Sequence, residues 1–186
     1  MTSPKDTGLT LRQLAYLHQM TVPEMDRLIS APAPKAIDFF KGNFTSSDAL
    51  EIEIARQMSD NDGIPLNEAL RLSLYASAVK SYVTQQAAVS SPHDFWFAVM
   101  ASRNTWGTAP RGSWPITGFG SNEYWAEMHY SGSLGAIMGE ISEWIGRDQA
   151  NHPDSDPSRI VMCNVSAADR RLRKRAVELG IELDIR

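Results

Sequence analysis

Three side chains on one expected strand are the best candidates in this sequence for catalysis or metal binding. Glu123, Glu127 and His129 occupy odd positions of residues 123–130, so an extended strand would place them on one face. Carboxylates beside an imidazole can bind a metal ion or move a proton. One histidine and two glutamates without a fixed ligand spacing form a weak pattern, and an exposed polar strand face is the preferred interpretation.

Other sequence patterns of catalytic chemistry do not occur. The chain contains neither G-x-S-x-G nor H-E-x-x-H. Cys163 is the single cysteine and lies in an apolar run, which indicates a buried, inert thiol and allows no internal disulfide. We therefore expect no catalytic residue, no metal site and no cofactor. A small hydrolytic or metal-dependent enzyme that uses Glu123, Glu127 and His129 is the weakest alternative.

A second candidate site is a cluster of aromatic residues in a glycine-rich segment. Residues 104–122 are rich in Gly, Pro, Ser and Trp, and the segment is longer than a plain connection. Aromatic rings beside glycines can form the walls of a pocket for a small molecule or a peptide. We predict a ligand pocket whose walls are the rings of Trp106, Trp114 and Trp125. Glu127 and His129 are its expected polar residues. The alternative is that the rings only close the loop over a sheet.

The charge distribution favours a local binding surface over a generally basic one. The 186 residues include 18 Lys+Arg and 22 Asp+Glu, for a net charge of −4, whereas nucleic-acid-binding domains are usually basic. One expected helix carries five cations in six positions, namely Arg170, Arg171, Arg173, Lys174 and Arg175. A solvated helix face is the preferred interpretation, and a second patch for nucleic acid or an acidic partner is the alternative.

Composition predicts an ordinary globular protein in a reducing compartment. Hydrophobic residues make up 42% and charged residues 22% of the chain, as in most globular domains. Residues 1–6 carry no apolar leader, and no run approaches the roughly 18 apolar residues that span a bilayer. We therefore expect a cytoplasmic protein that does not enter a membrane.

The front of the chain carries two consecutive signals for the start of a helix. Thr10 with Gln13, and Thr21 with Glu24, have the spacing of a capping box. The second cap follows the first helix so closely that only a tight turn fits between them. The pattern predicts a helix-turn-helix with Gln19 in the turn position that usually holds glycine.

Further elements are expected before the character of the sequence changes near residue 91. Residues 36–44 are predicted to form a short hairpin, with an aromatic-rich loop as the alternative. Thr45 is a good cap for a third helix. In residues 66–83 the apolar positions alternate steps of three and four, which predicts one long helix that is central to its domain or paired with a copy of itself.

The back half predicts an α/β unit in the order β-β-α-β-α-β. Strands are expected at residues 95–101, 123–130, 160–165 and 181–185, and helices at residues 133–147 and from a cap at Ser166 to Gly180. The predicted fold class is thus α+β. Its expected parts are a winged helix-turn-helix domain in residues 1–64, a long linking and dimerisation helix in residues 65–91, and an α/β ligand- or partner-sensing domain in residues 92–186.

Apolar and cap residues between positions 9 and 80 carry a resemblance to one protein family. The helix-turn-helix pattern is formed by Leu14-Ala15, Met20, Met25 and Leu28. Residues 44–50 read FTSSDAL and residues 63–69 read GIPLNEA. These segments resemble MerR-like winged helix-turn-helix regulators, in which an aromatic-Thr/Ser-x-x-Asp-Leu segment follows the wing and a Gly-apolar-x-Leu-x-Glu-Ala segment opens the next helix. The wing of that family carries an Arg near an aromatic residue, whereas here the cations are Lys35 and Lys41.

The resemblance implies a transcriptional regulator that binds double-stranded DNA, acts as a homodimer and responds to a small-molecule or protein effector. The residues expected to contact DNA are Arg12, His18, Glu24, Arg27, Lys35 and Lys41. Among them Arg27 is suited to a guanine edge or a phosphate. The alternative is a protein-interaction module without DNA binding, in which residues 66–83 drive oligomerisation.

Overall fold

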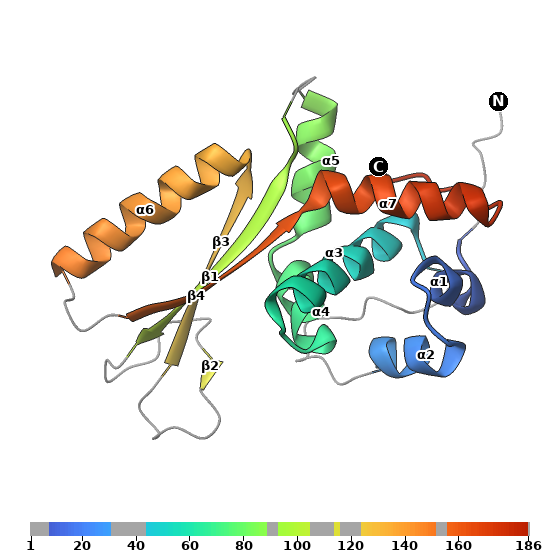
Figure 1. Cartoon of the computed structure of the whole chain (residues 1–186), viewed down its shortest axis with the longest axis horizontal. Helices are drawn as coiled ribbons and strands as arrows, with labels where there is room; N and C mark the ends of the chain where they lie inside the picture. The colour runs from blue at the N-terminus through green and yellow to red at the C-terminus, as the bar shows by residue number, and fades with distance from the viewer. Residues whose placement is uncertain are drawn as a thin grey trace. The chain divides into compact units, whose positions relative to one another are not determined.

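The chain forms an α+β protein with two compact units, as a computed structural model shows (Figure 1). A helical unit combines residues 1–92 with residues 164–186, and a second unit comprises residues 93–163. The structure describes residues 8–30, 44–88, 93–104, 114–115, 124–151 and 156–185. The predicted linking segment and the C-terminal helix thus lie in the same unit as the front helices.

Two short helices joined by a tight turn open the helical unit, as predicted. Helix α1 (Leu11–Leu17) begins after Thr10, whose side chain accepts the Gln13 N–H while its own N–H donates to the Gln13 side chain. Helix α2 (Val22–Ser30) begins with the same exchange between Thr21 and Glu24. Both capping boxes are confirmed, and each fixes the first turn of a helix too short to be stable alone.

The turn between α1 and α2 places Gln19 in the left-handed region, with a φ of 53°. This conformation costs a residue with a Cβ about 1–2 kcal/mol, which is why glycine commonly occupies it. Gln19 is exposed, so its side chain contributes little packing.

Gln19→Gly is therefore expected to raise the free energy of unfolding by about 0.5–1 kcal/mol, as measured by urea denaturation. The backbone strain that glycine relieves in the folded state is larger than the conformational entropy that glycine loses on folding. Gln19→Ala keeps the Cβ and serves as the control, with no change beyond about 0.5 kcal/mol expected. A glycine variant no more stable than the alanine variant would contradict this account of the turn.

Three further helices follow, and one of them corrects a prediction. Helix α3 (Ser46–Asp62) starts at the predicted Thr45 cap and ends at Gly63, which has a φ of 65°. The single helix predicted for residues 66–83 is wrong: α4 (Leu66–Tyr75) ends at a break and α5 (Ala78–Ala88) starts after it. Ser77 has a φ of 53° and therefore cannot continue an α-helix. The apolar residues keep their helical spacing across this break, although the helix itself is interrupted.

The apolar positions of these helices form one core. Leu72 and Val79 are 6% and 4% exposed, so they pack inside the helical unit. They therefore cannot serve as the dimerisation surface that a continuous helix would have offered. The other large side chains of this core with less than 2% exposure are Leu14, Leu17, Met25, Leu50, Ile52, Ile54, Met58 and Leu172.

The C-terminal helix α7 (Val165–Glu178) completes the helical unit and packs against α3 and α1. Its cap is Asn164, whose side chain accepts the Ala167 N–H at 2.8 Å, and the predicted cap at Ser166 is wrong. Leu172 lies in the core, whereas Leu179 is 46% exposed. The strand predicted for residues 181–185 does not form.

A single β-bridge joins the start of the helix-turn-helix to the start of α3. The N–H of Leu9 donates to the carbonyl of Phe44 at 2.6 Å, and the N–H of Phe44 donates back at 3.1 Å. Both side chains are buried. The bridge therefore brings the residues before α1 and before α3 together. Of the hairpin predicted at residues 36–44, only Phe44 belongs to the described residues.

The second unit is a four-stranded sheet with one helix. Strands β1 (Trp96–Asn104), β2 (Trp114–Pro115), β3 (Tyr124–Gly132) and β4 (Asp156–Asn164) lie in the order β2-β3-β1-β4. β1 and β3 are antiparallel in the register Trp96 to Gly132 through Asn104 to Tyr124, and β2 is antiparallel to β3. Strands β1, β3 and β4 and helices α6 and α7 correspond to predicted elements, whereas the two-residue strand β2, within residues 104–122, was not predicted.

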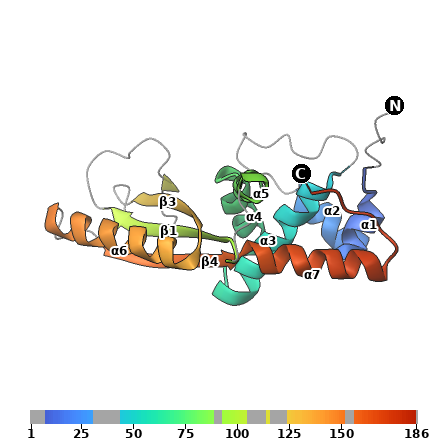
Figure 2. The same ribbon diagram turned by 90° about the horizontal axis from the view of Figure 1, so that it is seen from above.

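Helix α6 (Leu134–Asn151) lies against β1 and β3 on one face of the sheet (Figure 2). Ile137 and Ile141 pack there with alternate residues of β1, and Met128 and Tyr130 of β3 join them, as alternation along a strand requires. Leu134 and Met138 of the same helix are more than 40% exposed. No helix in the described part of the chain is long and apolar enough to cross a bilayer.

Candidate functional site

Helix α2 presents the most open face of the helical unit. Met25 is its only buried residue, and the two predicted DNA contacts on it, Glu24 and Arg27, are exposed, as are Pro23 and Asp26. Its partly buried apolar residues Val22, Leu28 and Ile29 complete the narrow face with which this amphipathic helix packs. The remaining surface of α2 stays accessible.

The predicted DNA contacts on α1 and α2 differ in their availability. The Nε of Arg27 donates to the Pro23 carbonyl at 3.3 Å, and within the described chain its two Nη groups have no hydrogen-bond partner. The Nε of Arg12 donates to the Tyr16 hydroxyl at 3.1 Å, with the guanidinium 5.7 Å from the ring centre. The Glu24 carboxylate accepts from the backbone and hydroxyl of Thr21, and those hydrogen bonds lower the pKa of Glu24. Lys35 and Lys41 lie outside the described residues.

His18 cannot contact DNA as predicted, because its side chain is fully buried at the end of α1. Its Nδ1 lies 3.3 Å from Oε2 of Glu53 on α3. Burial lowers the pKa of His18 and outweighs the hydrogen bond to Glu53, which raises it. The neutral imidazole that results joins α1 to α3 instead of binding phosphate.

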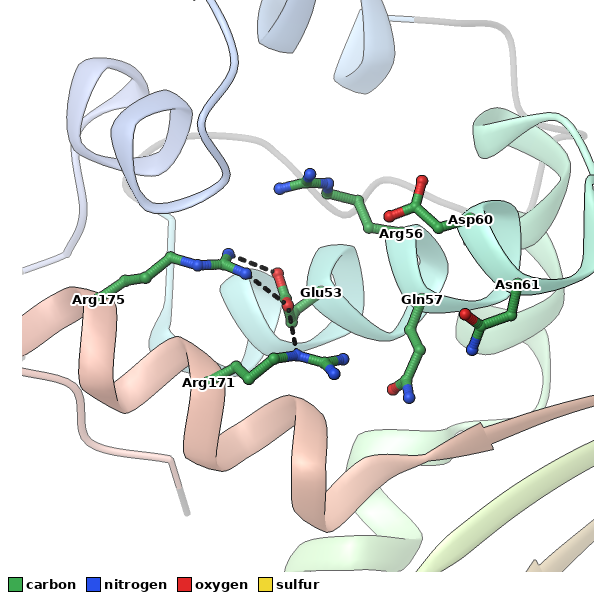
Figure 3. Close-up of a pocket in the computed structure, with 7 residues that line it drawn as sticks. All are labelled: Glu53, Arg56, Gln57, Asp60, Asn61, Arg171 and Arg175. Carbon is green, nitrogen blue, oxygen red and sulfur yellow. Dashed lines mark hydrogen bonds and ion pairs between the residues drawn. The ribbon is translucent and has the colours of Figure 1, made fainter.

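Glu53 is the centre of a polar cluster that the sequence patterns did not indicate. The guanidinium of Arg175 on α7 makes two hydrogen bonds to its carboxylate, at 2.9 and 3.1 Å, and Nε of Arg171 lies 3.5 Å from Oε1 (Figure 3). Burial alone would raise the pKa of Glu53, but the hydrogen bonds from His18 and Arg175 and the charge of Arg175 lower it to about 2. Glu53 is therefore a permanent anion that binds cations, not a proton donor.

Two arginines of this cluster also bind the end of α1. Nη1 of Arg175 donates to the carbonyl of Leu17 at 2.9 Å, and Nη1 of Arg56 donates to the carbonyl of His18. These are the last carbonyls before the turn, which a helix leaves without intrahelical partners. Arg175 thus joins three elements, because it binds Glu53 on α3 and Leu17 on α1 from its place on α7.

A small open pocket lies between α3 and α7 beside the cluster. Its volume is about 130 Å³. The side chains that line it are almost all polar, namely Glu53, Arg56, Gln57, Asp60, Asn61, Arg171 and Arg175 (Figure 3). Arg171 and Arg175 of this lining already bind Glu53, so the pocket belongs to the contact that holds α7.

A second polar contact holds the other side of α7. The hydroxyl of Tyr82 on α5 donates to Oδ2 of Asp169 at 2.8 Å, and Nε of Arg173 donates to Oδ1 at 2.7 Å. Burial and the neighbouring Asp169 carboxylate raise the pKa of Tyr82 to about 12. The five-cation stretch is therefore not a uniformly solvated face, because Arg171, Arg173 and Arg175 bind carboxylates.

The predicted aromatic pocket falls mostly on residues whose side chains are not described. Trp106 lies outside the described residues, and Trp114 and Trp125 are backbone partners across β2 and β3. Of the two polar markers, Glu127 lies opposite Ala101, and the His129 ring stacks on Phe97 with centres 6.4 Å apart. The pocket itself stays a prediction.

The remaining candidates are Cys163 and the two glutamates beside His129. Cys163 is buried, as its apolar surroundings predicted. Among the described residues, no group of three or more His, Cys, Asp and Glu side chains is placed to hold a metal ion, and Glu123 lies outside them. Comparisons with family models, curated proteins and solved structures found no match to this chain.

Proposed function

We propose that this chain is a DNA-binding transcriptional regulator whose helix α2 enters the major groove of double-stranded DNA. The observation that carries the proposal is the exposure of α2, in which Met25 is the one fully buried residue and which follows α1 after a tight turn. Helix-turn-helix proteins read DNA with a second helix presented in this way. A helix that served only the core would bury a wider apolar face.

The bridge between Leu9 and Phe44 supports a winged arrangement. Phe44 opens the FTSSDAL segment, which resembles the segment after the wing in MerR-like regulators. Its two backbone hydrogen bonds to Leu9 tie this segment to the residue just before α1. In the proposed arrangement this contact is the base of the wing, and Lys35 and Lys41 contact phosphates from it.

The exposed cations of the first two helices have separate roles in this proposal. Arg27 lies in the last turn of α2, where its Nη groups can bind a guanine edge or a phosphate. Arg12 on α1 binds the phosphate backbone. Glu24 contributes by capping α2 and has no role as a base contact, since its carboxylate binds Thr21.

Arg27→Ala is expected to weaken binding to a mixed-sequence 30-base-pair duplex roughly 5- to 100-fold at low salt. The slope of log affinity against log salt should become shallower by about 1, because one cation–phosphate contact is lost. Fluorescence anisotropy of labelled duplex at several salt concentrations measures both quantities.

Arg147→Ala is the matched control for this experiment. Arg147 lies on α6 in the second unit, its side chain is 68% exposed, and its Nε is 3.7 Å from Glu143. The substitution changes the net charge by the same amount and is expected to leave affinity and slope unchanged. Equal losses in the two variants would show that affinity comes from overall charge, and the role of α2 would be wrong.

A further inference from the structure

We infer that helix α7 is a latch that holds the helix-turn-helix in its binding conformation, with Arg175 as the positioning residue. This inference rests on the proposed function, and it concerns how that site is regulated. Arg175 does not need to contact DNA in this account. It acts through the carbonyl of Leu17 and the carboxylate of Glu53, both of which it binds.

The α1–α2 turn needs support from outside its own sequence. Helix α1 has only 7 residues, and short helices in water depend on tertiary contacts. Gln19, two residues after Leu17, holds a left-handed conformation that persists only when the surroundings fix it. Arginine side chains at the last carbonyls supply this support, since they satisfy those carbonyls and complement the negative end of the helix dipole.

Arg175 is suited to this task because it is itself held in place. Its side chain is 20% exposed, and the buried Glu53 carboxylate binds it through two hydrogen bonds. Bidentate pairing fixes the plane of a guanidinium, which a lysine cannot reproduce. Nη1 of the guanidinium held in this way also donates to the carbonyl of Leu17. The sequence distance is large, since Arg175 lies 158 residues after Leu17.

Helix α7 is also the element through which the second unit re-enters the helical unit. Strand β4 ends at Asn164 and α7 begins at Val165, with no linker between them. Asn164 belongs to the strand and caps the helix at the same time. The residue that ends β4 therefore also sets where α7 begins.

Hydrogen exchange at the turn tests the latch without DNA. The N–H of Met20 donates to Ala15 at 2.9 Å and that of Gln19 to Tyr16 at 3.1 Å, so both report on the turn. In Arg175→Gln we expect exchange at these amides to rise about 10-fold or more, the effect of losing a charge-assisted hydrogen bond.

Tyr82→Phe is the matched control, because it removes a polar contact on the other side of α7, the hydrogen bond to Asp169. It should loosen α7 without changing exchange at the turn. A merely structural role for Arg175 would raise exchange at Gln19 and Met20 equally in both variants, and that result would overturn the inference. Unchanged exchange in Arg175→Gln would overturn it as well.

DNA binding supplies the second readout. Arg175→Gln should lower affinity for the 30-base-pair duplex about 10-fold or more with an unchanged salt slope, since no phosphate contact is lost. A slope shallower by about 1 would show direct contact and contradict a positioning role.

Should Arg175→Gln not fold, Arg175→Lys keeps the charge without the bidentate geometry and is expected to show the same changes at smaller size. If the wild type binds no DNA while exchange still rises only in the Arg175 variant, the proposed function fails and the latch stands.

Discussion

Glu53→Gln is expected to lower the free energy of unfolding by about 3 kcal/mol at pH 7, one of the two largest effects that this structure predicts. The variant removes the charge of a carboxylate that is 3% exposed and leaves Arg175 and His18 around a neutral amide. Breaking one partner of a buried ion pair is costly because the other charge stays desolvated. Urea denaturation followed by circular dichroism at 222 nm measures the change.

The pH dependence of this difference follows from the pKa of Glu53. The folded state lowers that pKa from 4.5 to about 2, so the stabilising contribution is fully present above pH 4.5 and is lost as the pH falls toward 2. The wild type and the Glu53→Gln variant should therefore converge in acid. Glu143→Gln, on an exposed residue of α6, removes the same charge and should change stability by less than about 0.5 kcal/mol. A Glu53→Gln variant as stable as this control at pH 7 would contradict the account of the cluster.

Glu51→Gln, two residues earlier on the same helix, is expected to have the opposite effect. Burial raises the pKa of Glu51 to about 7, and the nearby Asp48 adds to this, against the hydrogen bonds from Ser73 and Val79. The folded state therefore binds a proton more tightly than the unfolded chain, and stability falls as the pH rises from 4.5 to about 7. A neutral glutamine avoids that loss and keeps an acceptor for the Val79 N–H, so the variant should be more stable by about 2 kcal/mol at pH 8.

The two glutamates make a paired test of these assignments. Stability measured from pH 4.5 to 8 should decline more steeply in the wild type than in Glu51→Gln, whereas Glu53→Gln should lie below the wild type throughout this range. A Glu51→Gln variant less stable than the wild type at pH 8 would mean that Glu51 is a stabilising anion. The burial that raises its pKa would then be compensated by a contact other than Ser73 and Val79.

Local rules were enough to predict the start of the chain. Thr10 and Thr21 cap their helices because the residue three positions later supplies the reciprocal hydrogen bond, and both partners are close in sequence. The αL position of Gln19 also follows from local geometry, since two caps so close together leave space only for a tight turn.

The contacts made by α7 could not be predicted in this way. The ion pair between Glu53 and Arg175 joins positions 122 residues apart, and no periodic pattern marks either residue. Glu53 looks like an ordinary surface glutamate on α3, and Arg175 like one cation among five. His18 was assigned to DNA because its type suits phosphate, whereas packing of α1 on α3 buries it.

The break at Ser77 shows a different limit of sequence patterns. Apolar steps of three and four continue from α4 to α5, because both helices face the same core. The side chain of Glu51 lies at the break, where it accepts from Ser73 and from the Val79 N–H at the start of α5. A long-range contact thus stabilises a helix start that the local sequence does not signal.

The most direct test of the central proposal is the affinity of the wild-type protein for DNA as a function of salt. Fluorescence anisotropy with duplexes from the region upstream of its own coding sequence, between about 50 and 200 mM salt, gives the affinity and its slope. We expect retention at low salt that weakens steeply as salt rises, and tighter binding to one upstream duplex than to a scrambled duplex of the same composition. No binding at low salt to any of these duplexes would contradict the assignment of α1 and α2 as a DNA-reading unit.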